Sequence, residues 1–183
     1  IDADSYIEVV GGTVVRDATW TDEIPLYISK WFDVLGTDGD DRTTTLVINP
    51  GAEIRFGNAG FQIGDSKFPD PGALVAQGAP DNPIIFTSNQ ANPSPSDWRG
   101  ISFEDSTNDE ISVLSHCIIE YAGTTSTILA SGAIDLYDAK PTIMYSNFRN
   151  NAKAGIYADG SGCNGAVIES NTFIGNSYGA YWS

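Results

Sequence analysis

Short apolar runs separated by turn residues extend along the whole chain. Runs rich in Ile, Val, Phe and Tyr are interrupted by Gly, Pro, Asn, Asp and Ser, and no segment carries the 3.6-residue period of an amphipathic helix. Within a run such as Glu53–Phe56, polar and apolar residues alternate. Ile54 and Phe56 are therefore expected on one face of the strand and Glu53 and Arg55 on the other. The pattern predicts an all-β protein made of short strands.

One four-residue phrase recurs at the width of a solenoid coil. It is written Gly100-Ile-Ser-Phe103, Ala133-Ile-Asp-Leu136, Gly155-Ile-Tyr-Ala158 and Gly179-Ala-Tyr-Trp182. The second residues of these phrases are 33, 22 and 24 positions apart, so the last three copies keep a nearly constant period. Such a period predicts coils that stack on one another.

A second series keeps the same register. Phe148 recurs as Phe173 and Asn151 recurs as Asn176, both after 25 residues. Stacked phenylalanines would extend the core from coil to coil, and asparagines at a turn can hydrogen-bond the backbone of the neighbouring turn. Two agreeing series predict a solenoid more firmly than one.

The chain has the length and apolar content of a single ordered domain, with 183 residues of which 41% are hydrophobic. Residues 1–45 do not follow the repeat and are predicted to form an irregular N-terminal cap with four short first strands. Residues 46–183 are predicted to form one continuous solenoid of roughly five to seven coils. Segments 65–71 and 90–97 are rich in Pro, Ser and Asp and are expected to be loops.

Five segments together resemble a known family. They are Gly12-Thr-Val-Val-Arg-Asp-Ala-Thr-Trp20, Leu46-Val-Ile-Asn-Pro-Gly51-Ala-Glu-Ile-Arg-Phe56, Gly72-Ala-Leu-Val-Ala-Gln-Gly78, Asn82-Pro-Ile-Ile-Phe-Thr-Ser88 and Asp97-Trp-Arg-Gly-Ile-Ser-Phe103. This succession is similar to the right-handed parallel β-helix repeat proteins of bacterial and archaeal cell surfaces, which share the pectin-lyase-like fold. The resemblance covers nearly the whole chain and implies a right-handed, single-stranded parallel β-helix with three sheets. It does not imply an enzyme, because many members are adhesive or structural modules.

The composition narrows the possible partners. The net charge is −15, with a pI near 4.1 and only nine Lys and Arg residues, so no nucleic acid is expected to bind. Strong acidity keeps an edge-rich β protein soluble and is common on extracellular surfaces. No apolar stretch reaches the roughly 18 residues of a membrane span. Because the chain begins with Ile1, we expect a processed or excerpted product.

The two cysteines, Cys117 and Cys163, lie 46 residues apart, or about two coils. Two coil steps correspond to ~9–10 Å, which exceeds the disulfide limit of about 7 Å between Cα atoms. We therefore expect free thiols, with Cys117 in the core. The single histidine, His116, is expected to be a strand residue with a structural role.

Outward positions of the repeated phrases carry candidate carbohydrate-binding residues. The alternation stacks Ser102, Asp135, Tyr157 and Tyr181 in one outer column and Glu104, Tyr137 and Asp159 in a neighbouring one. Carboxylates accept hydrogen bonds from sugar hydroxyls, and tyrosine faces stack on sugar rings. The alternative is that these are ordinary exposed strand residues.

Two of these carboxylates could act as acid and base in glycoside hydrolysis. Asp135 and Asp159 are offset by two positions on adjacent coils, which corresponds to roughly 6–9 Å. The Asp-Asp pairs and Gly-His-Gly segment of pectin-hydrolysing relatives are absent. A lyase would need a base and a cation beside the substrate carboxylate, and the nearest candidates, Arg99 and Arg149, fall outside the outer columns.

A separate acidic segment, 33–41, contains several oxygen ligands and two glycines. If Ca²⁺ binds, its ligands are predicted to be Asp38, Asp40 and Asp41, although the segment does not match the twelve-residue calcium loop. A solvated acidic turn is the alternative.

The sequence stops within a repeated strand, which predicts either a longer solenoid or an exposed edge that pairs with another copy. Pairing with an N-terminal strand of a neighbour would give head-to-tail filaments. The assembly candidates are Tyr6, Val9, Tyr178, Tyr181 and Trp182.

The leading functional hypothesis is a non-catalytic extracellular or cell-surface module, structural or adhesive, that self-assembles or contacts a surface polysaccharide. The alternative is a carbohydrate-active enzyme or polysaccharide-binding module of the pectin-lyase-like class.

Overall fold

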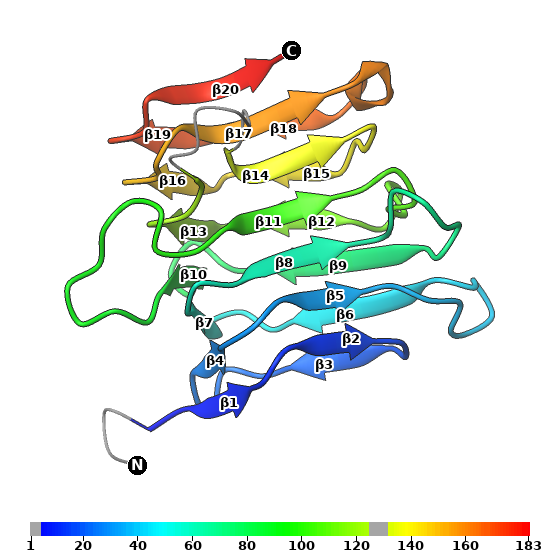
Figure 1. Ribbon diagram of the computed structural model, residues 1–183, viewed down its shortest axis with the longest axis horizontal. Helices are drawn as coiled ribbons and strands as arrows, with labels where there is room; N and C mark the ends of the chain where they lie inside the picture. Colours follow the sequence, from blue (N-terminus) through cyan, green and yellow to red (C-terminus); the bar gives the residue numbers. More distant parts are fainter. Residues whose placement is uncertain (1–4, 125–131) are drawn as a thin grey trace.

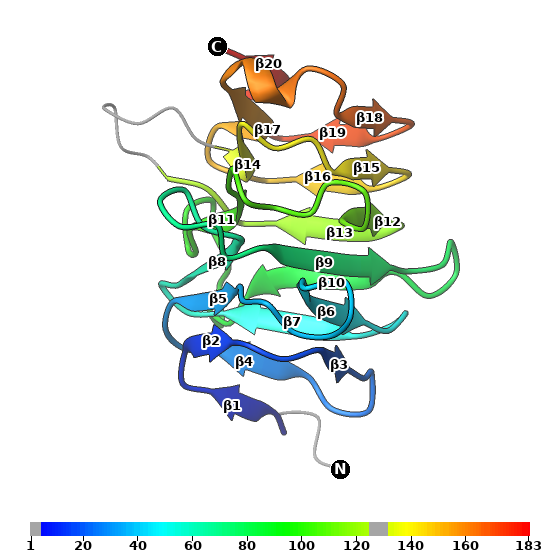
Figure 2. The same ribbon diagram turned by 90° about the vertical axis from the view of Figure 1, so that its right-hand side faces the viewer.

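The chain folds into a solenoid with three parallel sheets along its length (Figures 1 and 2). The computed structural model describes residues 5–124 and 132–183. In this part, successive strands enter the three sheets in turn, and each strand pairs in parallel with its counterparts in the adjacent coils. The predicted parallel β-helix is confirmed.

Each sheet takes every third strand. Sheet A contains β1 (Ile7–Val9), β4 (Leu26–Ile28), β7 (Glu53–Phe56), β10 (Ile84–Ser88), β13 (Cys117–Glu120), β16 (Asn147–Arg149) and β19 (Thr172–Ile174). Sheet B contains β2 (Gly12–Val14), β5 (Phe32–Val34), β8 (Gly60–Ile63), β11 (Gly100–Phe103), β14 (Gly132–Tyr137), β17 (Ala154–Asp159) and β20 (Tyr178–Trp182). Sheet C contains β3 (Ala18–Trp20), β6 (Thr44–Ile48), β9 (Gly72–Gln77), β12 (Val113–Ser115), β15 (Thr142–Met144) and β18 (Val167–Glu169). A single helical turn, η1 (Ser161–Cys163), follows β17.

The repeated phrases occupy equivalent positions in sheet B. Ile101 pairs with Ile134, Ile134 with Ile156, and Ile156 with Ala180. In sheet A, Phe148 pairs with Phe173, and their rings stack with centroids 5.2 Å apart. The two sequence series therefore mark two different sheets of the same coils.

The core is a continuous apolar column inside the three sheets. Inward strand positions such as Leu46, Ile54 and Ile134 are completely buried, as is Trp98 just before β11. The Trp98 ring stacks on Phe56 at 4.1 Å, and its Nε1–H donates to the backbone oxygen of Glu120. Trp98 thus fills the interior while its one polar atom is paired.

An asparagine ladder connects the corners between sheets A and B. The buried Asn151 accepts a hydrogen bond from the Ala122 N–H at 2.8 Å and donates through Nδ2 to the Ile119 oxygen at 3.0 Å. Asn176, one coil later, accepts from the Asn151 backbone and side chain and donates to the Phe148 oxygen. The ladder pairs backbone groups that the corner would otherwise leave unsatisfied.

Corner residues between sheets C and A adopt left-handed backbone conformations. His116 has φ of 50° and Tyr145 has φ of 52°, and their rings stack at 5.2 Å one coil apart. The prediction of His116 as a strand residue is wrong, because it lies in the corner between β12 and β13, where the chain must turn sharply.

The N-terminal stretch, predicted as a cap with entry strands, contributes strands to all three sheets of the solenoid. The strands from β1 to β5 pair in the same three sheets as the later strands, and the predicted boundary at residue 45 falls inside β6. The first three strands are only three residues long and partly exposed, so their sequence carries too few apolar positions to reveal the repeat.

The loops and thiols agree with expectation. Segments 65–71 and 90–97 lie in excursions between strands, and the longer one extends at the left of Figure 1. Cys117 and Cys163 are buried and free. In the described residues, no helix is long and apolar enough to cross a membrane.

Candidate functional site

The pairing register brings the predicted carbohydrate-binding residues together on the outer face of sheet B. Ser102, Asp135, Tyr157 and Tyr181 are successive neighbours across β11, β14, β17 and β20, and Tyr137 pairs with Asp159 beside them. Glu104 directly follows β11. These side chains point outward because the residues that alternate with them fill the core.

This cluster is more enclosed than the sequence predicted. Asp135 is only 8% exposed and Tyr157 only 6%, whereas Tyr181 at the end of the column is 46% exposed. Tyr157 stacks on Tyr181 at 5.8 Å, and its hydroxyl donates to Ser183, which in turn donates to Asp159. Asp135 and Tyr157 are therefore enclosed, and within this column of four residues Tyr181 has the exposed ring.

Enclosure changes the protonation of the acidic residues. Burial raises the pKa of Asp135 to about 7, the charge of Glu104 adds to the rise, and the Gly132 N–H and Lys153 oppose it. Burial also raises the pKa of Glu104 and that of Tyr137. Asp135 thus holds its proton at pH values where an ordinary aspartate is charged.

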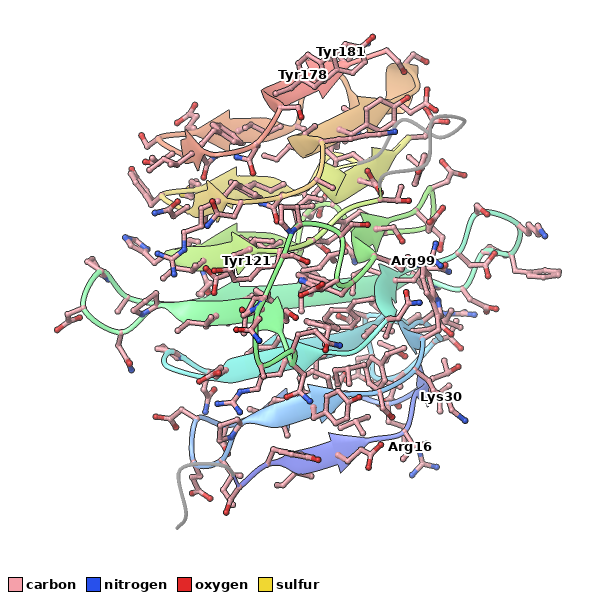
Figure 3. All side chains as sticks on the ribbon, turned by 60° about the vertical axis from the view of Figure 1, so that its left-hand side comes forward. Arg16, Lys30, Arg99, Tyr121, Tyr178 and Tyr181 are labelled. Carbon is pink, nitrogen blue, oxygen red and sulfur yellow. The ribbon has the colours of Figure 1, made fainter. Side chains whose placement is uncertain are left out.

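The other predicted residues lie beside this cluster or away from it. Figure 3 shows Tyr178 close to Tyr181 on β20 and Arg99 several coils away. The ring centroids of Tyr178 and Tyr181 are 5.9 Å apart. Arg99 is exposed and donates to Asn58. At the other end of the solenoid, Tyr6 and Val9 belong to the first coil. The two groups of predicted assembly residues therefore mark opposite ends of the described structure.

Two carboxylates of the acidic segment 33–41 accept hydrogen bonds from backbone N–H groups. Asp38 accepts a hydrogen bond from the Asp17 N–H at 2.8 Å, and Asp41 accepts one from the Thr43 N–H at 3.2 Å, while Asp40 is exposed. Among the residues that the structure describes, no group of three His, Cys, Asp or Glu side chains is arranged to hold a metal ion. The calcium ligands remain a prediction from the sequence.

Sequence reasoning missed a groove of about 510 Å³ on the outer face of sheet A. Its floor carries two ion pairs, Arg55 with Glu53 and Arg149 with Glu120, each with an Nε-to-oxygen distance of 2.6 Å. Thr87 donates to the second oxygen of Glu120 at 2.8 Å. The available signal was the polar residue at the outward position of successive strands in sheet A. In β10 and β13, however, Thr87 and Glu120 lie near the ends of mainly apolar runs, which hides this signal.

The groove has a fixed rim. The loop after β10 contributes Asn89 and Gln90, and Asp97 anchors this loop by accepting hydrogen bonds from Ser88 and Ser94. Burial alone would raise the pKa of Asp97, but these hydrogen bonds outweigh it and lower the pKa below its ordinary value. The anchoring carboxylate therefore stays ionised, which strengthens its hold on the loop.

No protein-family model, curated protein or solved structure matches this chain.

Proposed function

We propose that this chain is a non-catalytic module of an extracellular surface, in which the β-helix is a rigid scaffold with an adhesive outer face. The observation that carries the proposal is the enclosure of Asp135, one of the two candidate acids. Asp135 is enclosed and accepts the Gly132 N–H at 2.6 Å, and Asp159 accepts the Ser183 hydroxyl. A hydrolase needs its acid and base open to the bond they cleave.

Two further features support a scaffold. The buried apolar residues form one cluster that extends from Ile28 to Cys163, and the net charge of −15 favours solubility. Membership of the pectin-lyase-like class is proposed on the segments from Gly12 to Phe103 that resemble it.

A hydrolase is the second candidate, and one observation favours it. A carboxyl group with a pKa near 7, as in Asp135, suits a general acid at neutral pH. Asp159 is exposed on the next coil and would be its partner.

Turnover assays separate the two candidates. The protein is incubated with soluble neutral and acidic polysaccharides, and new reducing ends and unsaturated uronate products are measured against a heat-denatured control. The scaffold proposal expects neither product. Product formation that disappears in Asp135→Asn, with unchanged thermal stability of that variant, would establish the hydrolase and refute the scaffold.

Head-to-tail assembly through Tyr6, Val9, Tyr178, Tyr181 and Trp182 is proposed separately. The strands that the structure describes pair in parallel within each sheet, so a second copy stacked in the same direction would continue each sheet. Light scattering with negative-stain electron microscopy tests it: the proposal expects fibres, and a stable monomer at all concentrations would refute it.

A further inference from the structure

The groove on sheet A runs along the solenoid axis and not across it. Arg55, Thr87, Glu120 and Arg149 occupy equivalent outward positions in β7, β10, β13 and β16. Adjacent strands are ~4.8 Å apart, so Arg55 and Arg149 stand ~14 Å apart at their backbones. A ligand that contacts both arginines is therefore extended and lies perpendicular to the strands.

The two guanidinium groups are held in place by their glutamates. Each arginine uses Nε for its ion pair, and among the described residues neither makes a hydrogen bond through its Nη atoms. The Glu120 side chain is only 11% exposed, and both of its oxygens are occupied, by Thr87 and by Arg149. The protein thus orients arginine donors without using all of them, which reduces the entropy lost when a ligand binds.

An aromatic ring lies at the N-terminal end of the groove. Tyr6 is 46% exposed and makes an edge-to-face contact with Tyr27, with ring centroids 5.3 Å apart. This contact orients the Tyr6 ring, and nearly half of the residue stays accessible. An exposed tyrosine of this kind can stack on the apolar face of a sugar ring.

The charge balance selects the kind of ligand. Glu53 and Glu120 cancel Arg55 and Arg149, so the groove floor is neutral, within a chain whose net charge is −15. An acidic polymer would be repelled by the whole molecule and would compete with the glutamates for the arginines. A cation would have to displace the arginines from the glutamates. Neutral hydroxyl groups, which both donate and accept, match free arginine Nη atoms, the amides of Asn89 and Gln90, and the second oxygen of Glu53.

We propose that the groove on sheet A binds a neutral glycan in an extended conformation along the solenoid axis. This inference rests on the adhesive part of the proposed function and assigns its surface and its partner. The enclosed cluster on sheet B is not part of this site, because its residues belong to a different face of the solenoid.

Affinity gel electrophoresis tests the assignment with defined polymers. Native gels contain soluble mixed-linkage glucan, arabinoxylan or galactomannan as neutral probes, and polygalacturonate or alginate as acidic probes. We expect retardation by at least one neutral polymer, none by the acidic polymers, and titration affinities that high salt does not change. Arg149→Gln should weaken binding by about tenfold or more, because it removes charge-assisted hydrogen bonds.

Arg149→Gln leaves the nearly buried Glu120 with its Thr87 hydrogen bond but without its cationic partner, so a second variant guards against a folding defect. Tyr6→Ala changes an exposed side chain and should weaken binding by about threefold or more with unchanged thermal stability. Arg99→Gln is the matched control, since Arg99 is exposed and does not line the groove, and it should bind like the wild type.

The outcomes distinguish this inference from the proposed function. Retardation by acidic polymers only, abolished by salt, would overturn the neutral-glycan inference and leave an adhesive module. Neutral-glycan binding that both groove variants retain would overturn the location of the site. Retardation by none of the polymers would overturn both the inference and the adhesive role.

Discussion

Removing one side chain from the asparagine ladder should destabilise the solenoid far more than its size suggests. Asn151 is 2% exposed and is the partner of two backbone groups of the previous coil, the Ala122 N–H and the Ile119 oxygen. Asn151→Ala deletes both hydrogen bonds and leaves those groups in an environment where water cannot replace them. A buried polar group without a partner costs about 1–3 kcal/mol, so the two together cost about 2–6 kcal/mol.

A second substitution tests the donor role of the Asn151 side chain separately from its acceptor role. Asn151→Asp keeps an oxygen for the Ala122 N–H but cannot donate, and it places a carboxylate beside the Ile119 oxygen and the Asn176 Oδ1. It should therefore be less stable than the wild type, although it is nearly identical in shape. Asn164→Ala is the control, because Asn164 is exposed and outside the ladder.

Urea denaturation followed by circular dichroism measures these differences as changes in the free energy of unfolding. We expect the midpoint to fall for both ladder variants and to stay unchanged for Asn164→Ala. Hydrogen exchange at the Ala122 amide provides a local readout, and exchange there should accelerate in Asn151→Ala. A loss below about 1 kcal/mol for Asn151→Ala, with unchanged exchange at Ala122, would refute the view that the ladder satisfies buried backbone groups.

Three more outcomes follow from single residues. The pKa of Asp135 is about 7 in the folded state and exceeds its ordinary value of 3.8, so the folded state binds this proton more tightly. The stabilisation that the proton gives should be complete below pH 3.8 and disappear as the pH rises to about 7. Urea unfolding of Asp135→Asn at several pH values should lack this pH-dependent contribution. Burial raises the pKa of Cys117 to about 12, so iodoacetamide at pH 8 should label it, by mass spectrometry, only after denaturation. Trp98→Phe should cost about 1–3 kcal/mol in urea denaturation, because the Glu120 oxygen loses its indole donor; no loss would mean that this bond is replaced.

The architecture was readable from the sequence because a solenoid repeats its local contacts. Every inward position meets the same position one coil away, so Phe148 and Phe173, or Ile134 and Ile156, reveal the stacking through their spacing alone. The first coils were harder to recognise, because strands such as β1 and β2 are short and partly exposed and therefore lack a strong apolar pattern. The left-handed corner at His116 was also not predicted, because residues of several types adopt a φ near 50° in this fold and no sequence signal marks the position.

The properties of the sheet A groove and the sheet B cluster depend on the segments that surround each outer face, and strand periodicity carries no information about those segments. The spacing of the phrases determined that Asp135 and Tyr157 are neighbours on sheet B, but their enclosure, and with it the raised pKa of Asp135, comes from the surrounding tertiary structure. The groove on sheet A likewise arises because strands far apart in sequence place Arg55 and Arg149 on one line while the loop after β10 forms the rim. Periodicity specifies which residues share a face, because it depends on the local backbone. Exposure, ion pairing and hollowed surfaces depend on contacts between distant segments, and only the assembled coils determine them.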